Sequence, residues 1–314
     1  MIRIQNPYQN KDGVLRTIVK KAVPRGIIEY YKTAMRRKEL TRAIEWFHTE
    51  ERAGAIPLFH AVEIETINRC NGECPFCPVS KGHDIRKMHK MEDAVFYKII
   101  DELSSMNYSG NISLFSNNEP FIDERICGFA KYAKEHLPDA FLYLYTNGTL
   151  LTMEKYHSII PFLDMMFIDN YNDEMQLIPT VKEIVDESAS FHDYENKTIV
   201  SMRKINEVLT SRGGQAPNKV AREGTIDCPC LLPYQQLIIR PTGEVSLCCN
   251  DCYGKMTMGD VNKNTLLEIW ESDQYKKIRN MITESRSNLE LCKYCDTTTG
   301  ITDTENGKWK YRVL

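Results

Sequence analysis

The stretch Cys70-Asn71-Gly72-Glu73-Cys74-Pro75-Phe76-Cys77 carries three cysteines in the spacing Cys-x3-Cys-x2-Cys. It directly follows residues 59–67, whose side chains alternate as in a β-strand. Three thiolates in one loop can hold three corners of an iron–sulfur cube and leave the fourth iron open to a substrate or cofactor. A structural zinc site instead closes its shell with four ligands. The stretch therefore indicates a cluster site at the end of a first βα unit, where barrels place their ligand loops.

Strand and helix patterns alternate beyond this loop. The further strands are expected at residues 112–115, 141–145, 165–168 and 198–202, and the helices between them at 94–104, 125–136, 153–160 and 180–188. Such alternation predicts a parallel sheet of βαβ units. We expect an α/β fold in which a partial (β/α)6 barrel of the TIM type spans residues 60–225. A helical N-terminal extension (1–59), with a helix boundary at Pro24, precedes it, and a small cysteine-rich domain (226–314) follows it.

The composition is that of a globular protein, with 314 residues of which 42% are hydrophobic and 26% charged. The net charge of −3 argues against a globally basic nucleic-acid binder. Residues 1–60 are locally basic, with 12 Lys and Arg against 6 Asp and Glu. This segment is either a helical cap or a surface for an anionic partner or a membrane face. The eleven cysteines are an odd number, and neither a signal peptide nor a membrane span is evident. These features predict a cytoplasmic protein whose thiols bind metal.

With Phe76 placed just before its third cysteine, the loop resembles the cluster motif of the radical S-adenosylmethionine (radical SAM) superfamily. The resemblance covers roughly residues 60–225. It implies a 4Fe–4S cluster on Cys70, Cys74 and Cys77, with SAM chelating the open iron. One electron from that cluster would cleave SAM to methionine and a 5′-deoxyadenosyl radical, which abstracts a substrate hydrogen. The protein's part is to position these groups and to exclude water.

Two further segments match that superfamily, and three strand-end residues are candidates for contact with SAM. Ser116-Asn117-Asn118-Glu119-Pro120 stands where the family has Gly-Gly-Glu-Pro, whose carbonyls bind the SAM amino group. Both glycines are replaced by Asn, which tolerates left-handed backbone better than most residues. Thr146-Asn147-Gly148-Thr149 matches a Thr-Asn-Gly turn near SAM. Asp169, Asn170 and Arg203 end the fourth and fifth expected strands and are candidates for the SAM ribose or carboxylate. For these three the alternative is a turn or cap role.

The C-terminal region concentrates the remaining thiols. It holds seven cysteines, which are Cys228, Cys230, Cys248, Cys249, Cys252, Cys292 and Cys295. A hairpin (236–240 and 245–247) and a helix (266–281) are expected between them, so four thiolates would converge from the hairpin and a C-terminal knuckle. A zinc ribbon is the alternative for this region, because Cys-x2-Cys pairs favour zinc.

The tail pattern resembles the auxiliary-cluster domains called SPASM and Twitch. Because the second cysteine run of SPASM is missing, the shorter Twitch type is the better match. The resemblance implies one auxiliary 4Fe–4S cluster on Cys230, Cys248, Cys292 and Cys295. Cys127, Cys228, Cys249 and Cys252 stay unassigned, and Cys228 or Cys249 can replace one of the ligands.

These resemblances predict a radical SAM oxidoreductase. The tail spacing is similar to that of a superfamily dehydrogenase that oxidises a carbinol, so we expect a sugar or aminocyclitol as substrate and the auxiliary cluster as electron acceptor. Arg212 precedes two glycines between core and tail and is the candidate for contact with the substrate. A flavodoxin or ferredoxin is the expected reductant. Two alternatives stay open: a maturase acting on a ribosomal peptide, and a zinc-binding interaction protein without catalysis. The oligomeric state is not predicted.

Overall fold

The computed structural model describes residues 2–8, 24–188, 194, 196–223, 226, 228–300, 304–305 and 308–309. Its main sheet has nine strands in the order β1-β6-β5-β4-β3-β2-β7-β8-β9. The strands are β1 (Arg3–Gln5), β2 (Ala61–Ile64), β3 (Asn111–Ser113), β4 (Phe141–Thr146), β5 (Met165–Tyr171), β6 (Thr198–Arg203), β7 (Gln236–Ile239), β8 (Glu244–Ser246) and β9 (Thr257–Asp260). A separate short hairpin joins β10 (Thr304–Glu305) to β11 (Lys308–Trp309). The main helices are α2 (Arg25–Arg52), α3 (Asp93–Ser105), α4 (Ile126–His136), α5 (Met153–Ile159), α6 (Pro179–Glu187), α7 (Leu266–Trp270) and α8 (Asp273–Glu284).

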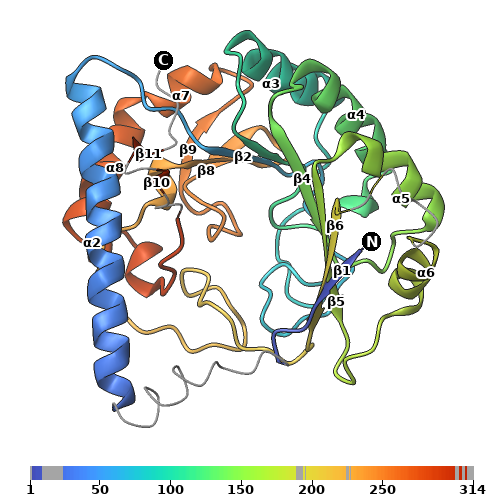
Figure 1. The fold of residues 1–314 in the computed structure, drawn as a ribbon. Helices are drawn as coiled ribbons and strands as arrows, with labels where there is room; N and C mark the ends of the chain where they lie inside the picture. Colours follow the sequence, from blue (N-terminus) through green and yellow to red (C-terminus); the bar gives the residue numbers. More distant parts are fainter. Residues whose placement is uncertain are drawn as a thin grey trace.

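The partial barrel is confirmed. Strands β2 to β6 run parallel and alternate along the chain with α3 to α6, which cover the outer side of the sheet (Figure 1). Two more strands run parallel to these five, one at each side: β1, which pairs with β6 and comes from the N-terminal extension, and β7, which pairs with β2 and comes from the tail. The extension therefore contains a strand that was not expected, in addition to the expected helix. Parallel strands bring their carboxyl ends to one edge, so the loops after β2 to β6 meet there.

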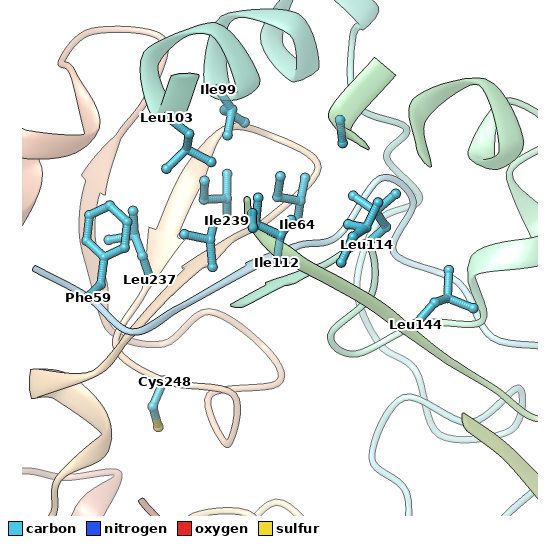
Figure 2. Close-up of a cluster of buried hydrophobic side chains, with 14 of the residues drawn as sticks. Phe59, Ile64, Ile99, Leu103, Ile112, Leu114, Leu144, Leu237, Ile239 and Cys248 are labelled. Atoms are coloured by element: carbon cyan, nitrogen blue, oxygen red, sulfur yellow. The ribbon is translucent and has the colours of Figure 1, made fainter. Parts of the chain in front are cut away.

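Alternation along the strands separates an apolar face from a polar one. Ile64, Ile112 and Leu144 belong to the hydrophobic cluster on the helix side of the sheet and are almost completely buried. Figure 2 shows Ile64 and Ile112 gathered under Ile99 and Leu103 of α3, while Cys248 lies apart from them on the other side of the strands. Burying one such side chain contributes about 2 kcal/mol. This layer fixes which side chains face the interior of the half-barrel.

Helix α2 begins directly after Pro24, as predicted, and packs against the tail. Its Phe47 ring lies 5.0 Å from the ring of Tyr234 and 6.4 Å from that of Trp270, centroid to centroid. The Trp270 indole donates to the Pro57 carbonyl oxygen at 2.9 Å. Within the described ranges no helix, α2 included, has the length and apolarity that crossing a membrane requires.

The tail hairpin is confirmed as β7 and β8, and β7 also pairs with β2 of the half-barrel. The prediction of a single helix over 266–281 was wrong, because α7 and α8 are separate helices. Ser272 begins α8, its hydroxyl accepting from the Tyr275 amide at 3.2 Å, and the chain must leave the helical conformation at such a cap. Residues 206–223, between β6 and the tail, fold against the tail, where Ser211 Oγ donates to the Tyr294 carbonyl at 2.7 Å.

Candidate active site

The loop after β2 brings its three thiols to one place. The Gly72 amide donates to Cys70 Sγ at 3.3 Å, and a Cβ added to Gly72 would lie 3.4 Å from Cys70 Sγ and 3.8 Å from Cys74 Sγ. The Cys77 amide closes a turn on the Cys74 carbonyl. Burial raises the pKa of the Cys70 and Cys74 thiols to about 12. These thiols therefore keep their protons at neutral pH until a metal displaces them.

Arg86 fixes this loop, a role that no sequence pattern indicated. Its guanidinium pairs with Glu65 at 2.9 Å and with Asp84 at 3.0 Å, and donates to the Asn117 carbonyl at 2.9 Å. Its side chain is only 10% exposed. Arg86 thus ties the cluster loop to the end of β2 and to the loop after β3.

Glu119 joins the loops after β3 and β4. Its carboxylate accepts from Thr146 Oγ1 at 2.7 Å, from the Asn147 amide at 2.8 Å and from the Phe121 amide at 3.2 Å. Burial raises its pKa to about 6 in spite of these donors. Asn147 continues the connection, since its side-chain amide donates to Asn71 Oδ1 at 2.9 Å. The two matched segments are thereby brought against the cluster loop.

The two asparagines that replace glycines have different surroundings. Asn118 Oδ1 accepts from the Ser116 amide at 3.1 Å, but its buried Nδ2 has no hydrogen-bond partner among the described residues. Asn117 Nδ2 donates to the Cys249 carbonyl at 3.2 Å and so reaches the tail. The unpartnered Nδ2 is a donor available to a bound acceptor such as a carboxylate.

Three residues at the ends of β5 and β6 were predicted as cofactor contacts. The structure brings two of them together and places the third on the opposite face of the sheet. Arg203 lies 3.7 Å from Asp169 and forms hydrogen bonds with both carboxylate oxygens of Glu207. Burial raises the pKa of Asp169. Asn170 is fully buried on the other face of β5, where it donates to the Gln176 carbonyl and accepts from the Ile178 amide, both at 2.9 Å. The structure therefore brings Asp169 and Arg203 together at the barrel interior and leaves Asn170 outside it.

Arg212 connects the core to the tail. Its Nη1 lies 3.4 Å from Asn117 Oδ1, 3.4 Å from the Cys249 carbonyl oxygen and 4.0 Å from Cys252 Sγ. Its φ of 50° is in the left-handed region and is followed by two glycines that also have positive φ. This backbone turn aims the guanidinium at the interior of the half-barrel.

The four tail cysteines of the expected cluster line a single cavity with apolar neighbours. These cysteines are Cys230, Cys248, Cys292 and Cys295, each at most 8% exposed. Burial raises the pKa of Cys230 to about 11 and that of Cys248 well above its ordinary value. Arg286, missed by the sequence reasoning, is buried beside them and donates to the Cys228 carbonyl at 2.7 Å. Its positive charge favours thiolates at this place.

The four remaining cysteines lie around these sites. Cys228 Sγ accepts from Arg286 Nη2 at 3.8 Å, Cys249 and Cys252 lie beside Arg212, and Cys127 is half-buried on α4. In the described part of the chain, no three His, Cys, Asp or Glu side chains are close enough for a single metal ion. The fit to clusters rests on the donor chemistry: the Cys70 and Cys74 thiols beside Gly72, with Cys77 near both of them in the same loop, and four thiols on one cavity.

Comparisons with known proteins find a match for each of the two regions of the chain that form this site. The family profile of the radical SAM superfamily matches residues 64–176, and that of the SPASM iron–sulfur cluster-binding domain matches residues 228–296. The chain is similar to the S-adenosyl-L-methionine-dependent 2-deoxy-scyllo-inosamine dehydrogenase of Niallia circulans, with 25% identity over 249 residues that make up 79% of this chain and 97% of the relative.

Two solved structures share the fold. The crystal structure of BtrN in complex with AdoMet and 2-DOIA has a TM-score of 0.66 at 24% identity and covers 82% of this chain and 99% of that one. An open conformation of selenomethionine BtrN has a TM-score of 0.56 at 22% identity, with coverages of 76% and 93%. Residues 64–176 therefore belong to the radical SAM superfamily and residues 228–296 to the SPASM cluster-binding domains, so this protein is a radical SAM enzyme that uses 4Fe–4S clusters and S-adenosylmethionine.

Proposed function

We propose that this protein is a dehydrogenase that oxidises a hydroxylated small molecule, a sugar or an aminocyclitol, at a carbinol carbon. The observation that carries the proposal is the cavity of four buried cysteines in the tail, whose Cys248 is followed in the chain by Cys249. The Cys249 carbonyl oxygen is contacted by Arg212 and by Asn117 of the half-barrel. The similarity to the aminocyclitol dehydrogenase, which extends over nearly all of that relative, supports it. The domain limits that we propose are 1–59, 60–225 and 226–314.

The first cluster is proposed to bind Cys70, Cys74 and Cys77. When bound beside that cluster, S-adenosylmethionine supplies a 5′-deoxyadenosyl radical that removes a hydrogen atom from the substrate. Glu119 holds the Thr146 and Asn147 segment against this loop, and Asn118 Nδ2 can donate to the bound cofactor.

Asp169 and Arg203, paired at the barrel interior, are proposed to contact the polar part of the cofactor. Arg212 is proposed to hold a hydroxyl group of the substrate between core and tail. Cys230, Cys248, Cys292 and Cys295 would hold the auxiliary cluster, a one-electron acceptor near the substrate. A flavodoxin or ferredoxin is the proposed reductant of the first cluster.

Two measurements test this assignment. Protein purified without oxygen should contain about eight irons and eight sulfides, and about four of each after Cys230→Ser and Cys292→Ser together. The matched Cys249→Ser and Cys252→Ser variant should keep about eight. Zinc in the tail would overturn the electron-acceptor assignment.

The substrate class is tested with 2-deoxy-scyllo-inosamine deuterated at its carbinol carbons. Wild-type protein with a chemical reductant should transfer deuterium into 5′-deoxyadenosine and release a ketone. A protein with Cys70, Cys74 and Cys77 replaced by Ala should do neither. Transfer of label from a ribosomal peptide and none from aminocyclitols or sugars would show that the substrate class is wrong.

A further inference from the structure

Glu63 is a carboxylate inside the half-barrel that the site described above does not use. Its neighbours on β2, Val62 and Ile64, point to the helix side and join the hydrophobic core. Because side chains alternate along a strand, Glu63 points to the opposite face, toward the loops that meet the tail. Its exposed fraction is only 8%.

The groups around Glu63 come from four other segments. Ser116 Oγ, after β3, donates to Glu63 Oε2 at 2.7 Å. The guanidinium of Arg212 attracts the carboxylate electrostatically. The carboxylate charge also acts on Tyr143 and Tyr145 of β4 and on Cys249 in the tail. Among the residues that the structure describes, none forms an ion pair with Glu63 within 4.0 Å. Burying an ionised carboxylate without such a partner costs folding free energy. Buried ionisable groups of this kind are typical of functional sites.

The other acids at this edge of the sheet already have a cationic partner or several hydrogen-bond donors. Glu65 is paired with Arg86 at 2.9 Å, Asp169 faces Arg203, and Glu119 accepts three hydrogen bonds. Arg212 cannot accept a proton, because a guanidinium stays protonated. Glu63 is held by one hydroxyl donor and stands near the arginine proposed to bind the substrate.

We propose that Glu63 is the proton acceptor of the oxidation, an inference that rests on the proposed function. Once the carbinol carbon has lost its hydrogen atom, Glu63 takes the hydroxyl proton and becomes a neutral carboxylic acid. The O–H bond breaks as the C=O double bond forms, and the remaining electron leaves to a 4Fe–4S cluster as one-electron acceptor. Arg212 stabilises the developing charge on the substrate oxygen, and Ser116 orients the carboxylate.

The acid–base properties of the site agree with this role. Burial raises the pKa of Glu63 to about 7, although the Ser116 hydrogen bond and the Arg212 charge both lower it. A base with a pKa near the working pH is deprotonated in a large fraction of the molecules and still binds a proton strongly enough to take it from the substrate. In wild-type protein, ketone formation should therefore rise with pH through about 7, while label transfer into 5′-deoxyadenosine stays flat.

The test uses the full-length protein with its clusters and the deuterated aminocyclitol. Glu63→Gln should keep about eight irons and transfer label within about threefold of wild type, but form ketone at least 100-fold more slowly. Its substrate radical should then accumulate and be visible by electron paramagnetic resonance. Glu63→Asp should recover part of the ketone, and Glu154→Gln, an exposed glutamate on α5, should behave as wild type.

A readout without turnover accompanies these rates. Infrared difference spectra of the purified protein, titrated from pH 5 to 9, should show carboxylic acid absorption that is lost near pH 7. Glu63→Gln should lack one part of this absorption, while the part from Glu65 and Glu119, whose pKa values burial also raises to about 7 and about 6, should remain. Wild-type ketone formation by Glu63→Gln, or loss of label transfer and ketone together in a folded variant with eight irons, would overturn the inference and leave the proposed function standing. If wild-type protein transfers no label, the proposed function fails and the inference falls with it. If Glu63→Gln does not fold, a flat pH profile of wild-type ketone formation overturns the inference.

Discussion

At the scale of single residues, the Glu119 carboxylate accepts three hydrogen bonds and joins the loops after β3 and β4. We expect Glu119→Gln to weaken S-adenosylmethionine binding at least tenfold, because an amide group would place its NH2 against one of the donors that now point at the carboxylate. Equilibrium dialysis of the cluster-loaded protein measures this. The exposed Glu124→Gln is the matched control. Unchanged affinity in Glu119→Gln would show that the two loops do not depend on this carboxylate.

Glu63 should also leave a signature in stability. Its pKa is about 7 in the folded protein against 4.5 for an ordinary glutamate, so the folded state binds this proton more tightly than the unfolded chain. The group therefore favours folding most below pH 4.5, and that contribution is lost as the pH rises to 7. The difference is on the order of 3 kcal/mol.

Glu63→Gln should accordingly be more stable than wild type at pH 8, and this gain should shrink as the pH falls to 5. The midpoint of urea unfolding at several pH values measures it, with Glu154→Gln as the variant that should show no trend. A gain independent of pH would mean that the carboxyl is already protonated at neutral pH or that it is well solvated.

The cysteines proposed as cluster ligands could be predicted from the sequence, but most of the residues that hold their loops in place could not. Ligand spacing such as that of Cys70, Cys74 and Cys77 is a local property of the chain, so it can be recognised without a fold. Arg86 lies nine residues after Cys77, and it meets Glu65 and Asn117 only because parallel strands end at one edge. Which side chains of a strand face the barrel interior likewise depends on how the strand is oriented against the core. This decides that Glu63 is buried inside the half-barrel and that Asn170 lies on the opposite face. That relation requires the packed sheet.

At the scale of elements, α8 joins the tail to α2 through a buried arginine. Arg279 donates to the carbonyls of Pro233 and Trp270, both at 3.0 Å, and its guanidinium lies 3.9 Å above the Trp270 ring and 5.1 Å from the Phe47 ring. Arg279→Ala would leave both carbonyls unpaired and a gap among the rings. We expect a loss of about 3 kcal/mol or more in the free energy of unfolding.

Chemical denaturation of the iron-loaded protein measures this loss. Lys277→Ala, an exposed cation on the same helix, removes the same charge and should cost less than about 0.5 kcal/mol. Equal effects of the two substitutions would show that the aromatic cage of Arg279 contributes nothing beyond charge.

The elements themselves were largely predictable where their patterns are long. The five strands β2 to β6 and the four helices between them follow from alternation and periodicity that extend over most of each segment. The strand β1 has three residues and gains its stability by pairing with β6, so no local pattern signals it. The break between α7 and α8 depends on Ser272 acting as a cap, which one hydroxyl in an otherwise periodic segment does not indicate on its own.

At the scale of the whole molecule, the core and the tail share one sheet and one hydrophobic core. Strand β7 lies beside β2 with four residues in register, and the buried cluster runs from α2 through the half-barrel to α8. The sequence predicted two regions because cysteine density changes near residue 226. Composition cannot show that the second region completes the sheet of the first.

This continuity predicts that the protein unfolds as one unit. Removing residues 223–314 would expose the β2 edge and uncover Phe47 on α2, which now packs against Tyr234 and Trp270. A truncated chain of 222 residues should therefore aggregate or unfold without cooperativity. The intact protein should show a single calorimetric transition with equal van't Hoff and calorimetric enthalpies. Two separate transitions in the intact chain, or a truncated chain that unfolds cooperatively, would mean that the half-barrel is stable by itself and that the tail only docks on it.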